Sequence, residues 1–98
     1  MPTKKEIDRP IQICRGVITD WDPYSLIANG APSDEFDSEI LAVVGQLDRI
    51  RSRNDAVHAV SRVFSFAFEP EYFGFHACAD VGATLFEQLV QAKLVVNE

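Results

Sequence analysis

Basic residues are missing from one long part of this sequence. The 98 residues include 15 Asp and Glu but only nine Lys and Arg, which gives a formal net charge of −6. None of the nine lies in residues 16–48, which we call the base-free segment. Contacts to phosphate need clustered Lys and Arg, so the composition argues against nucleic acid as a direct ligand. It argues equally against an anionic membrane surface, and it favours a basic protein partner.

Long apolar runs are missing as well. No stretch approaches the roughly 20 apolar residues of a membrane-spanning helix. Residues 1–14 carry charges followed by only a broken apolar run, which predicts that there is no secretory signal peptide. We therefore expect a cytoplasmic protein.

Cysteine and histidine are scarce. Cys14 and Cys78 form neither a CxxC pair nor a disulfide framework, and each falls on an apolar helix face, which predicts free buried thiols. His58 and His76 are expected at the surface, and His76 lies two positions from Cys78, so the two cannot form a local nucleophile–base pair on a helix. Zinc, calcium-loop and phosphate-binding glycine motifs are missing, so we expect no metal, no cofactor and no enzymatic activity.

The length and composition predict a single domain over residues 1–98, with residues 1–7 frayed. Apolar residues make up 47% of the chain, and seven of its residues are Phe. A chain of this size buries roughly 60–65% of its unfolded surface, which is enough for one core without disulfides.

The first helix is predicted over residues 9–19. Its apolar face follows the i, i+3, i+7, i+10 spacing of a helix with Ile11, Cys14, Ile18 and Trp21. A strand is the alternative, because this stretch is rich in β-branched residues, but the alternation of a strand fails and we favour the helix. Pro23 ends it, since the residue before a proline is pushed out of the helical conformation.

A second helix is predicted over residues 34–51. Ser33 would cap its N-terminus, and the acids of its first turn would interact favourably with the helix dipole, each by roughly 0.3–1 kcal/mol. Arg49 and Arg51 in its last turn also have the sign that the dipole favours. Its apolar stripe consists of Phe36, Ile40, Val43 or Val44, Leu47 and Ile50.

Two further helices follow. Asn54 would cap the third, which should end at residues 65–68, and Pro70 would start a separate helical turn. The fourth is predicted over residues 73–91, and its small residues would let a neighbouring helix approach closely; these are Ala77, Ala79, Gly82 and Ala83. The predicted fold is therefore all-α, a compact bundle of about four helices with a long ordered loop between the first two.

Residues 21–39 combine aromatic and acidic side chains. Aromatic anchors supply binding energy and acids steer a basic partner, so we predict a partner-binding surface here. Its residues are Trp21, Asp22, Tyr24, Asp34, Glu35, Asp37 and Glu39. The aromatic and the acidic side chains each have a competing structural explanation. Trp21 and Phe36 can belong to the core, and the acids can cap the second helix. Carboxylates of one helical face, such as Asp34 with Asp37, could also hold a divalent cation, although capping explains them more simply.

Part of this stretch resembles a known family. The segments W-D-P-Y at residues 21–24 and P-S-D-E-F-D-S-E-I at residues 32–40 are similar to the W-D-P and D-E-[YF]-D segments of a family of small bacterial helical proteins. Phe36 stands where Tyr is expected, which removes one hydroxyl, and the C-terminal half carries no signature of the family. The matching residues are Trp21, Asp22, Pro23, Pro32, Asp34, Glu35, Phe36, Asp37 and Glu39.

The resemblance implies a helical fold and an immunity role. The family is known mainly as a domain of unknown function, and similar small acidic proteins occur beside polymorphic or contact-dependent toxins as their immunity proteins. Together with the base-free segment, it leads us to expect an immunity-type binding protein that neutralises a basic bacterial toxin domain, such as a nuclease, by occlusion with an acidic face. The alternative is a structural or regulatory interaction module, a homo-oligomer formed through the Ala/Gly-rich face of the fourth helix. An enzyme or metal protein built on the carboxylates of residues 34–39 is the third hypothesis.

Overall fold

Four α-helices make up most of the part of the chain that the structure describes. The computed structural model describes residues 4–23, 26–31, 35–68 and 70–95. The elements are α1 (Lys4–Trp21), α2 (Asp37–Val44), the 3-10 helix η2 (Leu47–Arg49), α3 (Arg53–Ala67), the 3-10 helix η3 (Pro70–Tyr72) and α4 (Ala79–Gln91). No strand occurs among these residues, so the predicted all-α class is confirmed.

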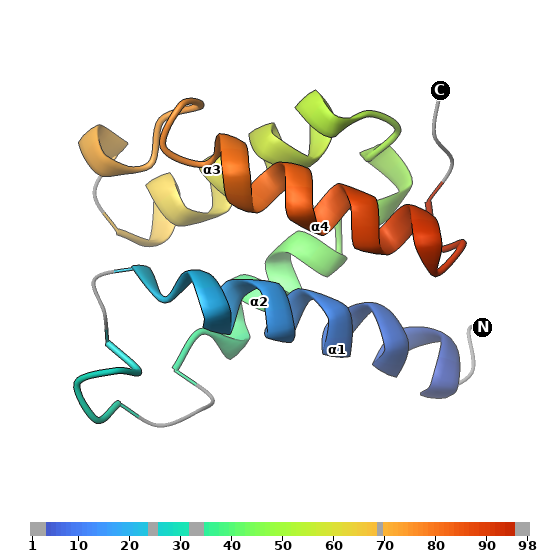
Figure 1. Ribbon diagram of the computed structural model, residues 1–98, viewed down its shortest axis with the longest axis horizontal. Coiled ribbons are helices and arrows are strands. Elements are labelled where there is room, and N and C mark those ends of the chain that lie inside the picture. Colours follow the sequence, from blue (N-terminus) through green and yellow to red (C-terminus); the bar gives the residue numbers. More distant parts are fainter. Residues whose placement is uncertain (1–3, 24–25, 32–34, 69, 96–98) are drawn as a thin grey trace.

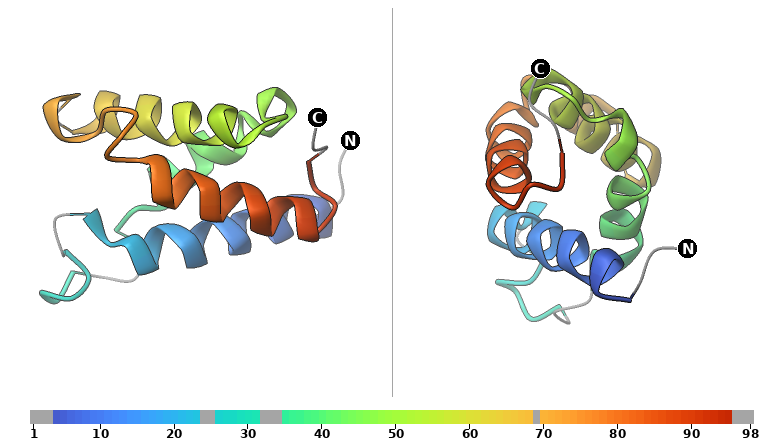
Figure 2. Two further views of the ribbon diagram at one scale, coloured as in Figure 1. Left: turned by 45° about the horizontal axis from the view of Figure 1, so that its top comes forward. Right: turned by 90° about the vertical axis from the view of Figure 1, so that its right-hand side faces the viewer.

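The four helices surround one core. Seen along the molecule, in the right-hand panel of Figure 2, α1, α4, α3 and α2 follow one another around the centre. Neighbours in this order make the most extensive helix contacts: α1 with α4, α4 with α3, α3 with α2, and α2 with α1. α4 runs antiparallel to both α1 and α3 (Figure 1). None of the described helices is long and apolar enough to cross a membrane.

Phe64 of α3 lies at the centre of an aromatic core and is fully buried. The ring of Trp21, the last residue of α1, meets Phe64 edge-on with the ring centroids 5.0 Å apart. The ring of Phe36, just before α2, lies 6.1 Å from the same ring. Aromatic pairs of this kind contribute about 0.5–1.5 kcal/mol beyond the area that they bury. The linker from α1 to α2 is thus anchored at both ends on one side chain of α3.

α3 and α4 approach each other closely at Gly82. This glycine is buried, and a Cβ built on it would lie 2.6 Å from the Cα of Val57, so a side chain cannot fit without a shift of the backbone. The predicted close approach of a helix to the small residues of the fourth helix is confirmed at this position. The contact also shows that a second copy cannot use the face of α4 at Gly82, because α3 already covers it.

α1 begins earlier than predicted. It starts at Lys4 and contains Pro10 inside it, whereas the prediction began the helix at residue 9 and left residues 1–7 frayed. The frayed assignment is wrong for residues 4–7, and residues 1–3 lie outside the described part. A proline inside a helix loses one backbone hydrogen bond. Pro10 is buried, and this packing offsets the missing bond.

α2 is shorter than the predicted helix over residues 34–51. Its C-cap is Gly45, and the chain turns there before the 3-10 helix η2. Glycine is a poor helix former, so the helix ends at this residue although the apolar spacing continues. The tighter 3-10 turn still brings Ile50 into a buried position. At the other end, the predicted cap Ser33 lies outside the described residues, and Phe36 occupies the N-cap position without a side-chain hydrogen bond.

α3 is capped by a different residue from the one predicted. The hydroxyl of Ser52 accepts a hydrogen bond from the N–H of Asp55 at 3.1 Å, and Asn54 lies inside the helix. Ser followed three residues later by an acid resembles the capping-box pattern, but the Asp55 carboxylate accepts the N–H of Arg51, one residue before the cap, at 3.0 Å. The cap at Ser52 therefore outcompetes the one expected at Asn54.

α4 begins at Ala79, later than the predicted start at residue 73. The Phe73 carbonyl accepts hydrogen bonds from three side chains, those of Ser61, Ser65 and Cys78. Two of these donors lie on α3, so the carbonyl is turned toward that helix. Residues 73–78 therefore form the turn that leads from α3 into α4 and not the first turns of α4.

Candidate functional site

Five of the seven predicted partner-binding residues lie in the described part of the chain. Tyr24 and Asp34 lie outside it. The other five come from the end of α1, the linker and the start of α2: Trp21, Asp22, Glu35, Asp37 and Glu39. The structure gives most of them an intramolecular role, and this narrows the surface that a partner could contact.

Trp21 belongs mostly to the core. Its ring packs edge-on against Phe64 at 5.0 Å and against Phe73 at 5.8 Å, and the residue is half-buried. The predicted core role is therefore the main one. The part of Trp21 that stays accessible lines a pocket between α1 and α4.

Asp22 holds the turn that follows α1. Its φ of 46° lies in the left-handed region, which Asp adopts more readily than most residues other than glycine. One carboxylate oxygen accepts the N–H of Ile27 at 2.9 Å, and the other accepts the N–H of Ala28 at 3.0 Å. Both oxygens are thus engaged by the linker, and this carboxylate serves the fold.

The acids around the start of α2 have different surroundings. Asp37 pairs with Arg15 of α1, whose Nη2 lies 3.0 Å from Asp37 Oδ1. Glu39 lies in the first turn of α2, where the helix dipole favours an acid. Glu35 precedes the helix and is exposed. Of these three, Glu35 is the most accessible to a partner.

On the folded surface, basic residues from outside the base-free segment lie close to its acids. Arg15 of α1 pairs with Asp37. Arg62 of α3 and Glu39 of α2 line one hollow between these two helices. An ion pair between exposed side chains is worth only about 0–1 kcal/mol, but it reduces the local negative potential. The sequence therefore overstates how far the acids are separated from bases in space.

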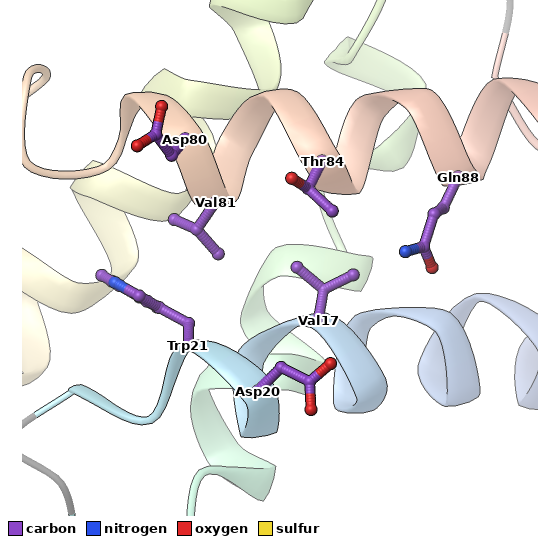
Figure 3. Close-up of a pocket in the computed structure, with 7 residues that line it drawn as sticks. All are labelled: Val17, Asp20, Trp21, Asp80, Val81, Thr84 and Gln88. Atoms are coloured by element: carbon purple, nitrogen blue, oxygen red, sulfur yellow. The ribbon is translucent and has the colours of Figure 1, made fainter.

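A pocket with a volume of about 250 Å³ lies between α1 and α4, next to Trp21 (Figure 3). Val17 and Val81 face each other across it, and Asp20 and Asp80 lie on opposite helices. We call it the α1–α4 pocket. It is lined by Val17, Asp20 and Trp21 of α1 and by Asp80, Val81, Thr84 and Gln88 of α4. It combines an apolar floor with a polar rim that carries two carboxylates.

The sequence pattern did not single out Asp20 or Asp80 as site residues. Both are exposed. Asp80 lies in the first turn of α4, where the helix dipole favours an acid. Asp20 lies in the last turn of α1, which has no basic residue, and an acid there opposes the dipole by roughly 0.3–1 kcal/mol. This unfavourable position was a signal available in the sequence, whereas the presence of Asp80 at the same pocket follows only from the packing of α1 against α4.

The core itself offers little reactive chemistry. Cys14 and Cys78 are free and buried, as predicted. Desolvation by burial raises the pKa of Cys14 to about 12 and the pKa of Cys78 to about 11, so both thiols are protonated and weakly nucleophilic at neutral pH. His58 and His76 are exposed, also as predicted. Within the described ranges there is no group of three or more His, Cys, Asp or Glu side chains that could hold a metal ion.

No family model, no curated protein and no solved structure matches this chain. The resemblance of its W-D-P and D-E-F-D segments to small bacterial helical proteins therefore stays a prediction. A helical fold alone does not define a function, so the function has to be argued from the pocket and the charges around it.

Proposed function

We propose that this protein binds a basic protein partner at the α1–α4 pocket, as an immunity-type protein that neutralises a basic toxin domain such as a nuclease. The observation that carries the proposal is the presence of Asp20 and Asp80 on opposite helices at the rim of a pocket with an apolar floor. Carboxylates around an apolar pocket are complementary to the side chains of Lys and Arg.

A Lys or Arg side chain of the partner suits this pocket along its whole length. In the proposed complex the aliphatic stem lies on Val17 and Val81, and the charged end meets one of the two carboxylates, because Figure 3 shows Asp20 and Asp80 apart from each other, with the Asp80 carboxylate directed away from α1. For Arg, Thr84 and Gln88 supply further oxygen acceptors for the five N–H donors of the guanidinium group. The accessible edge of Trp21 adds apolar contact.

Three of the other acids of the base-free segment have a role in the fold. Asp22 holds the linker, Asp37 pairs with Arg15, and Glu39 lies where the dipole of α2 favours an acid. Asp20 instead opposes the dipole of its own helix. Residues that break a local stability rule tend to lie at functional sites.

Neutralisation in this proposal is occlusion without turnover. The protein covers the active site of the toxin, or a surface next to it, and no bond is made or broken. The net charge of −6 accelerates the encounter with a basic domain, and this effect weakens as salt is added.

The test begins with co-purification of this protein with the product of the gene immediately upstream of its own. The variant Asp20→Asn/Asp80→Asn should then lower the affinity for that partner roughly tenfold, which corresponds to about 1.4 kcal/mol, with the largest loss in the association rate at low salt. Asp48→Asn is the matched control, because Asp48 is an exposed acid of the base-free segment that does not line the pocket. It should leave the affinity almost unchanged.

Two results would count against the proposal in different ways. If no neighbouring gene encodes a toxin and no basic nuclease binds below micromolar concentration, the immunity function is wrong. If the partner binds the double variant as tightly as the wild-type protein, the function stands but the α1–α4 pocket is not its site.

A further inference from the structure

A second hollow lies between α2 and α3. In the right-hand panel of Figure 2 this pair of helices lies opposite the pair formed by α1 and α4. Its volume is about 500 Å³, and most of its wall is apolar. We call it the α2–α3 groove. The residues that matter below are Glu39 and Ala42 of α2 and Arg62, Val63 and Phe66 of α3.

Phe66 is the most exposed large apolar side chain in the described part of the chain. It is 94% exposed, compared with 62% for Tyr72 and 56% for Leu41, so almost none of its ring is used by the fold. Helical geometry explains why. Residues two apart do not face the same side of a helix, and Phe64 already takes the core side of α3. Because the burial of an apolar side chain is favourable, this ring is suited to an interface.

The charges at the groove are of both signs. Glu39 comes from α2 and Arg62 from α3, and no ion pair joins the two within the described ranges. The Nη1 of Arg62 donates a hydrogen bond to Oε1 of Gln46 at 3.3 Å. A basic partner would meet the positive charge of Arg62 here, and an acidic partner would meet the negative charge of Glu39. A second copy of the same surface, turned by a two-fold axis, instead brings each Arg62 toward the Glu39 of the other copy.

We propose that two copies of this chain associate through the α2–α3 groove about a two-fold axis, with the Phe66 ring of each copy in the groove of the other. The groove supplies both the apolar ring and the apolar recess that receives it, and it supplies both charges of the ion pair. An isologous interface requires this self-complementarity, because the same surface is used twice. A dimer through this groove takes the place of the homo-oligomer expected through the Ala/Gly-rich face of α4, because α3 covers that face at Gly82.

The dimer and the proposed partner site are independent of each other. The groove belongs to α2 and α3, and the α1–α4 pocket belongs to the other two helices. Both pockets of the dimer stay open, so each dimer can bind two basic partners. Failure of the dimer would leave the partner-binding proposal unaffected.

Sedimentation velocity and light scattering over a range of concentrations test the dimer in the purified 98-residue chain. The wild-type protein should be a dimer, and Phe66→Asp should raise the dimer dissociation constant by more than about tenfold. Leu41→Asp is the matched control, because Leu41 is an exposed apolar residue that does not line the groove, and this variant should remain dimeric. Circular dichroism of both variants shows that they are folded, as expected for substitutions at exposed positions.

Charge reversal tests the ion pairs directly. Glu39→Arg and Arg62→Glu should each weaken the homodimer, because each places like charges opposite one another in both pairs. An equimolar mixture of the two single variants should form a heterodimer, and the double variant Glu39→Arg/Arg62→Glu should recover the homodimer.

Three outcomes would overturn the proposal. These are a wild-type chain that is monomeric at every concentration, a Leu41→Asp variant that dissociates as readily as Phe66→Asp, and a mixture of charge variants that does not associate. If the protein is a monomer and Phe66 becomes buried only when a different protein is bound, the groove is a binding site for that protein and not for a second copy.

Discussion

α3 meets its two neighbours in different ways. Against α4, the missing side chain of Gly82 lets the backbone of Val57 come so close that even a methyl group would clash. Against α2, the helices leave a groove of about 500 Å³ with the exposed Phe66 at its edge. The core is thus complete on the α4 side of α3, whereas the α2 side retains apolar surface that the fold does not use. The comparison shows that the fold uses one side of α3 fully and leaves apolar surface exposed on the other, and three substitution experiments examine that difference.

The largest effect is expected from two phenylalanines of α3 that are two residues apart. Phe64→Ala should lower the free energy of unfolding by about 3–5 kcal/mol, because it removes a fully buried ring from the centre of the core. Phe66→Ala should change the stability of the monomer by less than about 0.5 kcal/mol, because that ring is exposed. Urea unfolding followed by circular dichroism, at concentrations low enough to exclude association, measures both. Equal losses would mean that Phe66 is part of the core.

Two glycine-to-alanine substitutions compare a close helix contact with open space. Gly82→Ala should cost about 1–3 kcal/mol, because the new methyl group meets the backbone of Val57. Gly16→Ala in α1 should raise the stability by about 0.5–1 kcal/mol, because its Cβ meets nothing within 4 Å and Ala is the better helix former. Thermal unfolding midpoints should therefore move in opposite directions. A neutral Gly82→Ala would show that α3 and α4 are further apart than described here.

The core and the α2–α3 groove also differ in their titratable groups. No polar or charged residue is buried in the described part of the chain. The titratable groups of the core are therefore the thiols of Cys14 and Cys78. The titratable groups of the α2–α3 groove are Glu39 and Arg62. The unfolded thiols ionise near pH 9.0, but in the folded protein the pKa of Cys14 is about 12 and that of Cys78 is about 11. Above pH 9 the unfolded state releases protons that the folded state keeps. The stabilisation is therefore complete below pH 9 and is lost at about 1.4 kcal/mol per pH unit for each thiol as the pH rises toward its folded pKa.

Urea unfolding at a series of alkaline pH values measures this loss. Lys and Tyr side chains also titrate in this range, so the informative comparison is with the variant Cys14→Ala/Cys78→Ala. The variant should start from a lower stability and show a flatter decline above pH 9. Parallel pH profiles for the two proteins would contradict a thiol origin.

Much of the fold could be predicted because its cause is local. The helical spacing of Ile40, Val43 and Cys14 gave the buried faces correctly, and all three are fully or almost fully buried. The small residues of the fourth helix predicted a close helix contact, which Gly82 makes. The ends of the helices were harder to predict, because two local rules compete there. At Gly45, weak helix propensity prevailed over continuing apolar spacing, and at Ser52 one capping residue prevailed over another nearby.

The candidate site could be predicted only in part, because it depends on contacts between distant residues. Arg15 and Asp37 are 22 positions apart, and nothing in their local sequence indicates the ion pair that they form. Asp20 and Asp80 are still further apart and meet at one pocket only because α1 packs against α4. The predicted role of Asp22 in partner binding rested on its charge, whereas its carboxylate is held by two backbone N–H groups of the linker.

The two aromatic anchors on Phe64 have a consequence for how this sequence can change. Trp21 and Phe36 hold the two ends of the linker against α3, so each end is fixed by its own aromatic contact. Between them Leu26 and Ile27 also pack against the core, so exchanges at exposed linker positions such as Ala28 are the ones that leave the core packing intact. A protease cut there should likewise yield two fragments that stay together in solution. The exposed positions of the linker can therefore change in sequence with little loss of stability.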